Sequence, residues 1–277
     1  LANLNFVGTN DLTLSGRVTL VNDSAVNVVS GSTLTLSGVM VGGGVLAKTG
    51  AGTLVLSGES GVTGGTRVGA GTLTTVGSNR LSDFALDVAS GATVNLGGNE
   101  NVGLLTGAGT INLGANALTV GSDLALATTA FSGTLAGTGT LVKFGPGTQN
   151  FLTASTYTGG TFLRGGDLIV SAAGALGTGT ITIDAQTTSA TRLLLNDGVT
   201  LANNLVIGGR TGGTGTGSIA MLSKNHSATV SGTVTISADN PASILAGGVI
   251  VGPIGGVGVL SFTGPINLTT FIPDSSA

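Results

Sequence analysis

The chain of 277 residues has a formal net charge of −3, and only 8% of its residues are charged. A basic nucleic-acid surface is disfavoured because the isoelectric point is about 4.8, and base stacking is disfavoured because only 3% of the residues are aromatic. The absence of cysteine excludes disulfides and thiolate metal sites. With 41% hydrophobic residues and 51 glycines, the chain must bury apolar surface in some regular fold.

Short segments in which apolar and polar residues alternate recur through the first half of the chain. They start at Leu12, Leu34, Leu54, Leu73, Val94 and Ile111, at nearly regular intervals. Alternation with a period of two predicts strands with one face turned inward, and an interval of about 20 residues predicts that each strand stacks on its counterpart one turn later. We therefore expect an all-β parallel solenoid of about 14 turns. It is expected to form a single domain over residues 1–277.

Strand-like segments follow more closely in the second half. They start at Leu168, Ile181, Leu193 and Leu205, at little more than half the earlier interval. More than one strand must therefore fit into each turn. Glycine, Asn and Asp between the segments, as at Asn196-Asp197-Gly198, provide the positive-φ corners at which the chain changes direction.

A longer repeat lies over this pattern, with one unit at 44–73 and a second at 139–168. Leu46, Lys48, Gly50, Gly52, Thr53, Thr63-Gly64-Gly65-Thr66, Gly71 and Leu73 recur in the same order as Leu141, Lys143, Gly145, Gly147, Thr148, Thr158-Gly159-Gly160-Thr161, Gly166 and Leu168. No gap is needed to align the two units.

These units resemble the passenger-associated repeats of bacterial autotransporter-like proteins. The second unit departs from the pattern at 148–151, where Thr-Gln-Asn-Phe replaces the Thr-Leu-Val-Leu of 53–56. The resemblance implies a right-handed β-helix in an exported protein, located outside the cell or at the bacterial surface. It does not imply one activity, since such coils commonly serve as stalks, adhesins and fibres. We expect a structural role as a stalk, adhesin or filament subunit without catalysis, because the carboxylates are spread along the chain rather than clustered.

The charged residues that recur in register are Lys48 and Lys143. We expect both to flank strands, with the ammonium group in water and the stem over apolar surface, rather than to contact an acidic glycan. Tyr157 is expected to cap one turn of the coil rather than to stack on a sugar.

Catalytic and metal-binding patterns are nearly absent. His226 lacks a third orienting group for a nucleophilic triad and is interpreted as a solvated turn residue. Glu59 and Glu100, about two turns apart, could approach the spacing of a glycosidase pair, but each is expected to lie in a turn. The run 212–217 resembles a calcium-binding nonapeptide, yet Gly217 stands where the carboxylate is required. We expect no catalytic residue, no bound cofactor and no metal site.

The stretch 240–273 carries no formal charge. Its glycines and Pro253 disfavour a transmembrane helix. Since neither end carries a charged capping segment, either flanking turns have been removed or chains associate end to end through strands such as Ile266–Leu268. The alternative function is a β-helix that binds or cleaves polysaccharide, with a surface glycan as partner. Scattered carboxylates disfavour it, because such enzymes cluster acidic groups on one face.

Overall fold

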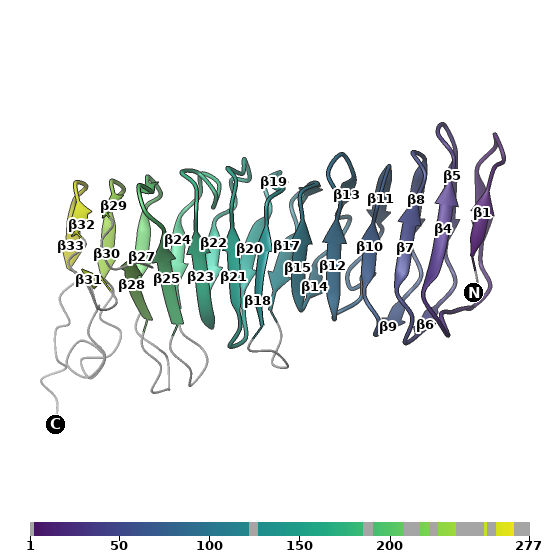
Figure 1. Cartoon of the computed structure of the whole chain (residues 1–277), viewed down its shortest axis with the longest axis horizontal. Coiled ribbons are helices and arrows are strands. Elements are labelled where there is room, and N and C mark those ends of the chain that lie inside the picture. Colours follow the sequence, from purple (N-terminus) through teal and green to yellow (C-terminus); the bar gives the residue numbers. More distant parts are fainter. Residues whose placement is uncertain are drawn as a thin grey trace, which may run out of the picture.

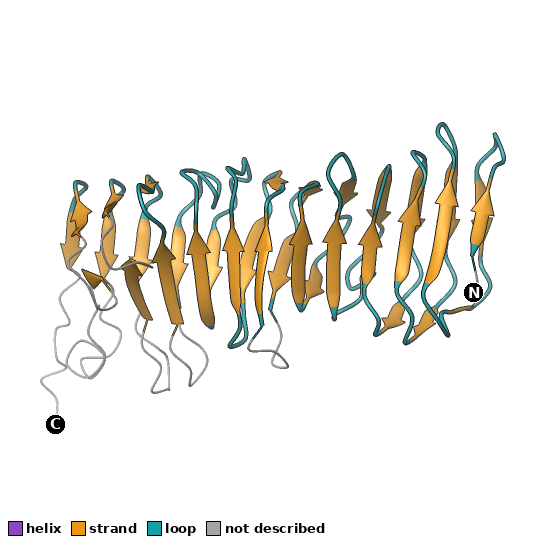
Figure 2. Ribbon diagram, viewed as in Figure 1, coloured by secondary structure: helices purple, strands orange, loops and turns teal. Residues whose placement is uncertain are grey.

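The chain forms a straight stack of short strands. The computed structural model describes residues 3–121, 127–184, 191–207, 217–221, 227–236, 252–253 and 259–268. The stack is elongated, with β1 at one end of the long axis and β32 and β33 at the other (Figure 1). All regular elements in the described ranges are strands (Figure 2), and no helix long and apolar enough to cross a membrane occurs among these residues.

The largest sheet has 12 strands, all paired in parallel with the neighbouring turn. They are β1 (Leu4–Phe6), β4 (Ser24–Val28), β7 (Leu46–Thr49), β10 (Thr66–Val68), β12 (Ala85–Val88), β15 (Leu104–Gly107), β18 (Thr128–Phe131), β21 (Thr148–Phe151), β23 (Gly166–Val170), β25 (Thr191–Leu195), β28 (Gly217–Met221) and β31 (Gly252–Pro253).

In most turns the strand that follows belongs to a second side of the solenoid, whereas the turns that contain β21 and β23 pass this side at 152–160 and 171–180 without a strand. The seven-stranded sheet of this side consists of β2 (Leu12–Leu14), β5 (Thr33–Leu36), β8 (Thr53–Leu56), β11 (Thr72–Thr75), β13 (Thr93–Asn95), β16 (Thr110–Asn112) and β19 (Thr134–Ala136). Further along, the same place in the turn is taken by the three-stranded sheet of β26 (Thr200–Leu201), β29 (Ser227–Val230) and β32 (Val259–Phe262).

The third side completes each turn before the chain returns to the 12-stranded sheet. It begins with a three-stranded sheet of β3 (Val18–Thr19), β6 (Met40–Gly42) and β9 (Ser60–Val62). It continues with an eight-stranded sheet of β14 (Glu100–Val102), β17 (Ala117–Val120), β20 (Thr140–Lys143), β22 (Thr161–Leu163), β24 (Ile181–Ile183), β27 (Leu205–Ile207), β30 (Val234–Ile236) and β33 (Ile266–Leu268).

The register confirms the strand spacing seen in the sequence. In the seven-stranded sheet the predicted starts are direct partners, as in Leu34↔Leu54 and Leu54↔Leu73. The closer segments of the second half alternate between two sides, since Leu168 pairs with Leu193 and Ile181 with Leu205. A parallel β-solenoid with more than one strand per turn is therefore confirmed.

The expected number of about 14 turns was too high. The largest sheet contributes one strand per turn and has 12 strands over the described residues. The register step from Lys48 to Val68 matches the interval assumed from the sequence, but the step from Val170 to Leu195 is longer. The loops between strands are therefore longer in the second half, and the same number of residues forms fewer turns.

The interior is a column of stacked aliphatic and aromatic side chains. Leu34, Leu54 and Leu73 are fully buried, and the buried rings of Phe131 and Phe151, which are register partners, meet edge to face at 6.2 Å between centroids. Burial of this kind contributes about 25 cal/mol per Å² of apolar surface, so the interior stabilises the fold. Most of the buried apolar residues in the described ranges belong to one continuous core.

Candidate functional site

The two repeated lysines lie inside the solenoid, which corrects the expectation of solvated ammonium groups. Lys48 and Lys143 are 0% and 1% exposed. Lys48 belongs to an inward column between Val26 and Val68. The alternation of β7 explains this placement, because Lys48 shares the inward face with Leu46, two residues earlier.

The ammonium group of Lys48 is satisfied by backbone oxygens alone. Its Nζ donates to the carbonyl of Thr49 at 2.8 Å, of Gly50 at 2.6 Å and of Ala70 at 3.0 Å. The first carbonyl is at the end of β7, the second is in the corner that follows, and the third belongs to the next turn. Three donors thus meet three acceptors, and the side chain ties one corner to the corner above it.

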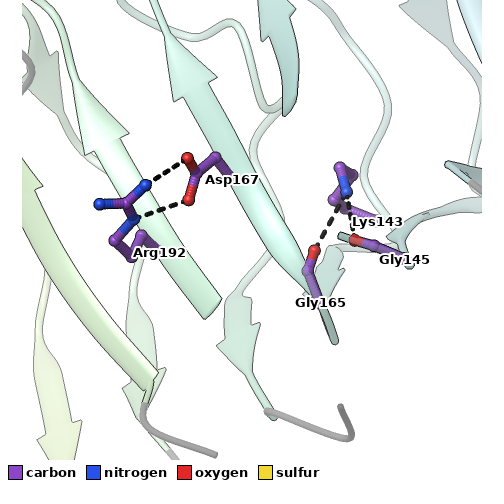
Figure 3. Close-up of polar contacts among 5 residues, drawn as sticks. All are labelled: Lys143, Gly145, Gly165, Asp167 and Arg192. Atoms are coloured by element: carbon purple, nitrogen blue, oxygen red, sulfur yellow. Dashed lines mark hydrogen bonds and ion pairs between the residues drawn. The ribbon is translucent and has the colours of Figure 1, made fainter. Parts of the chain in front are cut away.

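The second repeat reproduces this arrangement. Lys143 Nζ donates to the carbonyls of Phe144, Gly145 and Gly165, each at 3.0 Å. Figure 3 shows the contacts with Gly145 and Gly165. The acceptors lie one, two and 22 residues beyond the lysine, the same offsets as at Lys48. Burial lowers the pKa of both lysines to about 8, and at Lys143 the charge of Asp167 acts in the opposite direction.

The glycine two residues after each lysine is required by the corner itself. Gly50 and Gly145 have φ values of 73° and 74°, a region that L-residues seldom adopt. At Gly50 a Cβ atom would lie 2.3 Å from the carbonyl oxygen of Val28 in the preceding turn. The Lys-x-Gly pattern therefore combines a tight corner with the cation that caps its carbonyls.

Glu100 is also buried, which overturns its expected place in a turn. It is 1% exposed and begins β14, whereas Glu59 is exposed between β8 and β9. Its Oε2 accepts the backbone N–H of Arg80 at 2.9 Å and of Leu81 at 3.0 Å. Burial raises the pKa of Glu100, and these hydrogen bonds partly oppose that effect.

This carboxylate occupies a break in the third side of the solenoid. The three-stranded sheet ends at β9 and the eight-stranded sheet begins at β14, and the intervening turn passes this side at 77–84 without a strand. Glu100 supplies the acceptor that a neighbouring strand would otherwise provide. Because one glutamate points inward and the other into solvent, Glu59 and Glu100 do not form a glycosidase pair.

Tyr157 is enclosed within the solenoid and presents no ring surface to a sugar. It is 0% exposed and its hydroxyl shares a hydrogen bond of 2.5 Å with Thr161 Oγ1. Burial raises its pKa. It fills the interior of a turn rather than covering an end of the coil.

Two inward polar residues were missed by the sequence interpretation. Gln149, in the stretch where the second repeat departs from the first, accepts from Thr129 at 2.7 Å and donates to the carbonyl of Leu105 at 3.3 Å. Asn203 donates to the carbonyl of Gly179 at 2.7 Å in the preceding turn. The sequence could have indicated that both side chains point inward, because each lies two residues from a buried apolar residue of the same alternating pattern.

The remaining candidates are His226 and the 212–217 run. His226 lies outside the described residues, as does the 212–217 run apart from Gly217 in β28. No group of three or more metal-binding side chains occurs within the described ranges. The cavity beside Lys143 and Gln149 has a volume of about 10 Å³, room for about one water molecule.

Charged side chains on the outer surface pair across neighbouring turns. Asp167 accepts from Nε and Nη2 of Arg192 at 2.7 and 2.6 Å, and the two residues are register partners in the 12-stranded sheet (Figure 3). Arg67 and Asp87 form a similar pair at 3.3 Å. These ion pairs join neighbouring strands of the sheet. Because Asp167 and Asp87 are each paired with an arginine, neither is a free carboxylate available for acid–base chemistry.

Comparison with known proteins agrees with this geometry. The model of the passenger-associated-transport repeat matches residues 46–74 and 141–170, the two lysine corners. The adhesin BmaC autotransporter of Brucella suis biovar 1 (strain 1330) is 33% identical over 206 residues, which are 71% of this chain and 6% of that adhesin. No solved structure matches the chain. The chain is therefore a parallel β-solenoid that carries passenger-associated-transport repeats and is distantly homologous to an autotransporter adhesin.

Proposed function

We propose that this chain is a rigid, non-catalytic segment of an exported bacterial surface protein, folded as one solenoid over residues 1–277, and that it acts in adhesion. The observation that carries the proposal is the pair of lysine corners in matching repeats, because they tie successive turns together without presenting a reactive group. A stack of such turns holds its surface at a fixed distance and orientation.

The location is tested with an antibody raised against the purified chain. Intact cells of the source organism should bind the antibody, and brief protease treatment of intact cells should remove that signal while leaving a cytoplasmic marker. An antibody signal that requires lysis of the cells would contradict a surface location.

The adhesive role is tested by displaying the chain on an otherwise non-adherent bacterium. Displaying cells should attach to epithelial monolayers more than cells displaying Leu168→Asp, in which a charge enters the fully buried position of β23. If both strains display equal amounts of the chain and attach equally well, the adhesive role is contradicted, and the chain acts only as a spacer.

Self-association is part of the proposal. β33 ends the eight-stranded sheet in the described structure, so its outer edge has no strand partner among these residues. A charged side chain on such an edge opposes pairing, and Asn267→Lys should therefore shorten filaments of the purified chain without changing its far-ultraviolet spectrum. Electron microscopy in which both proteins are monodisperse single rods would refute end-to-end association.

A further inference from the structure

The 12-stranded sheet contains one weakly joined step, between β15 and β18. The register pairs β15 with β12 of the preceding turn at four positions, and β18 with β21 of the following turn at four positions. Between β15 and β18 it holds the single pair Gly107↔Phe131. Continued along both strands, that register would set Leu105 opposite Thr129, a pair that is absent from the described structure. We call this step the seam.

The other two sides of the solenoid are fully joined between the same two turns. On the second side, β16 pairs with β19 from Thr110↔Thr134 to Asn112↔Ala136. On the third side, β17 pairs with β20 at four positions. Since a parallel ladder carries evenly spaced hydrogen bonds along its length, these two turns are held firmly on two sides and weakly on one.

The exposure of β18 shows the same weakness independently of the register. Thr129 stands in the column of inward residues in which Leu105 and Leu168 are fully buried, yet it is only half-buried. The outward residues Thr128 and Ala130 are exposed, whereas the outward positions of β12 and β21 are half-buried. The neighbouring strands therefore cover β18 less well than the other strands of this sheet.

Gln149 bridges the seam with its side chain. It is 3% exposed, and its Nε2 donates to the carbonyl of Leu105 at 3.3 Å while its Oε1 accepts from Thr129 at 2.7 Å. Because Leu105 lies two turns earlier, in β15, the amide reaches past β18 and supplies a donor that β18 provides in a complete ladder. A cavity of about 10 Å³ lies beside it, lined in part by Leu104 and Thr129. Leu54 stands at the matching position of the first repeat, so the departure of the second repeat coincides with the seam.

The interruptions on the other sides differ from the seam because the chain fills them. The strandless segments 77–84, 152–160 and 171–180 each place an apolar side chain in the core. These are Leu81, Tyr157 and Leu176, with exposures of 2%, 0% and 0%. The packing of the solenoid is therefore maintained where these segments pass.

We propose that the seam is a hinge at which the solenoid bends, and that Gln149 is the latch that holds it closed. Local opening occurs where backbone pairing and buried apolar contacts are few. The 12-stranded sheet opens between β15 and β18, while the pairs β16–β19 and β17–β20 stay joined and form the pivot. The bend therefore has one direction, with the 12-stranded sheet on the convex side. The turns on either side of the seam stay rigid, and the inference does not depend on the cellular location or adhesive role proposed above.

The experiment measures distances between pairs of spin labels by double electron–electron resonance. The chain contains no cysteine, so introduced cysteines are the only labelling sites. Arg67→Cys with Asn150→Cys spans the seam, and the control pair Ala25→Cys with Thr106→Cys lies entirely before it. Both pairs face outward on the 12-stranded sheet and are four turns apart, or about 19 Å. We expect the spanning pair to give the broader distribution, with a tail toward longer distances.

A change at position 149 tests the latch. Gln149→Leu should broaden the distribution of the spanning pair further and leave the control pair unchanged. Asn203→Leu is the matched control, because it removes another inward amide that donates to a backbone carbonyl, that of Gly179, and it should leave both distributions unchanged. Each variant is checked for folding by its thermal melt. If Gln149→Leu does not fold, Thr129→Val removes the hydroxyl that Gln149 accepts from and should broaden the spanning distribution in its place.

The two labelled pairs decide the hinge with Gln149 intact. Equal widths of the spanning and control distributions would overturn it. An unchanged spanning distribution in a folded Gln149→Leu, or equal broadening by Asn203→Leu, would refute the role of Gln149 as the latch.

Discussion

Lys48 and Lys143 occupy the same position of the long repeat but lie on different sides of the solenoid. Lys48 ends the inward face of β7 in the 12-stranded sheet, and Lys143 ends β20 in the eight-stranded sheet. Each is followed by a corner and by the strand on the next side, β8 in one case and β21 in the other. The repeat therefore specifies a strand, a corner and a strand, and it functions at more than one corner of the turn.

Removal of one corner ammonium group should weaken the fold. Lys143→Met keeps much of the stem but leaves the carbonyls of Phe144, Gly145 and Gly165 without their donor. Unsatisfied buried acceptors cost about 1–3 kcal/mol, so the free energy of unfolding should fall by about that amount in a denaturant titration. Arg67→Met, which removes an exposed ion pair, should cost less than about 1 kcal/mol. An unchanged or more stable Lys143→Met would contradict a capping role.

The same lysines predict a rise of stability at moderately alkaline pH. Their pKa of about 8 in the folded chain is below the value of about 10.4 expected when unfolded, so between these values the unfolded chain binds more protons. The free energy of unfolding should therefore increase from pH 8 to about pH 10. Above about pH 10 the trend should reverse, because the raised pKa of Tyr157 favours ionisation of the unfolded chain.

Denaturant titrations at several pH values test this behaviour. The double variant Lys48→Met/Lys143→Met should show no rise between pH 8 and 10. A wild-type profile that falls through this range, or a double variant that retains the rise, would show that other groups control alkaline stability.

Much of the fold could be predicted from the sequence because inward residues repeat with simple periods. The alternation at Leu54 and Leu56 and the spacing to Leu73 identified both the strands and their partners one turn away. The number of turns was overestimated because connection length is set by loops, which carry no periodic signal. The long register step from Val170 to Leu195 illustrates this.

The same alternation of inward and outward residues predicts that Lys48 and Glu100 are buried. The general exposure of charged residues led to the opposite prediction. Lys48 follows Leu46 by two residues and Glu100 precedes Val102 by two, so both share an inward face. Charged residues are nearly always exposed, and that general tendency favoured a solvated position for each. The hydrogen-bond partners that make this burial possible include backbone atoms of the adjacent turn, at Ala70 for Lys48 and at Arg80 for Glu100. Backbone partners of this kind cannot be identified from the identities of the side chains.

Neighbouring residues of one strand should differ sharply in their contribution to stability. Leu56 points into the core and is fully buried, whereas Val55 faces outward on β8. Leu56→Ala should lower the free energy of unfolding by about 2–5 kcal/mol, and Val55→Ala by less than about 1 kcal/mol. Glu59→Gln, in the exposed connection, should stay within about 0.5 kcal/mol of wild type. Equal losses at positions 55 and 56 would contradict the inward register of β8.

Glu100 should oppose stability as the pH rises toward neutrality. Because burial raises its pKa above the unfolded value of about 4.3, the folded chain binds the proton more tightly, and ionisation of the carboxyl costs folding free energy. Glu100→Gln keeps an oxygen for the N–H groups of Arg80 and Leu81 but cannot ionise. The difference in unfolding free energy between this variant and wild type should therefore shift in favour of the variant between pH 4 and pH 7.

A matched apolar variant separates the charge from the hydrogen bonds. Glu100→Leu also lacks the charge, but at the break between β9 and β14 it leaves the buried N–H of Leu81 and the partly buried N–H of Arg80 without an acceptor. An unpaired buried group costs about 1–3 kcal/mol. The leucine variant should be less stable than Glu100→Gln at every pH, while its difference from wild type changes with pH in the same direction. If the glutamine variant follows the wild-type profile in parallel, the titration of Glu100 does not contribute, and its carboxylate acts only as an acceptor for the strandless segment 77–84.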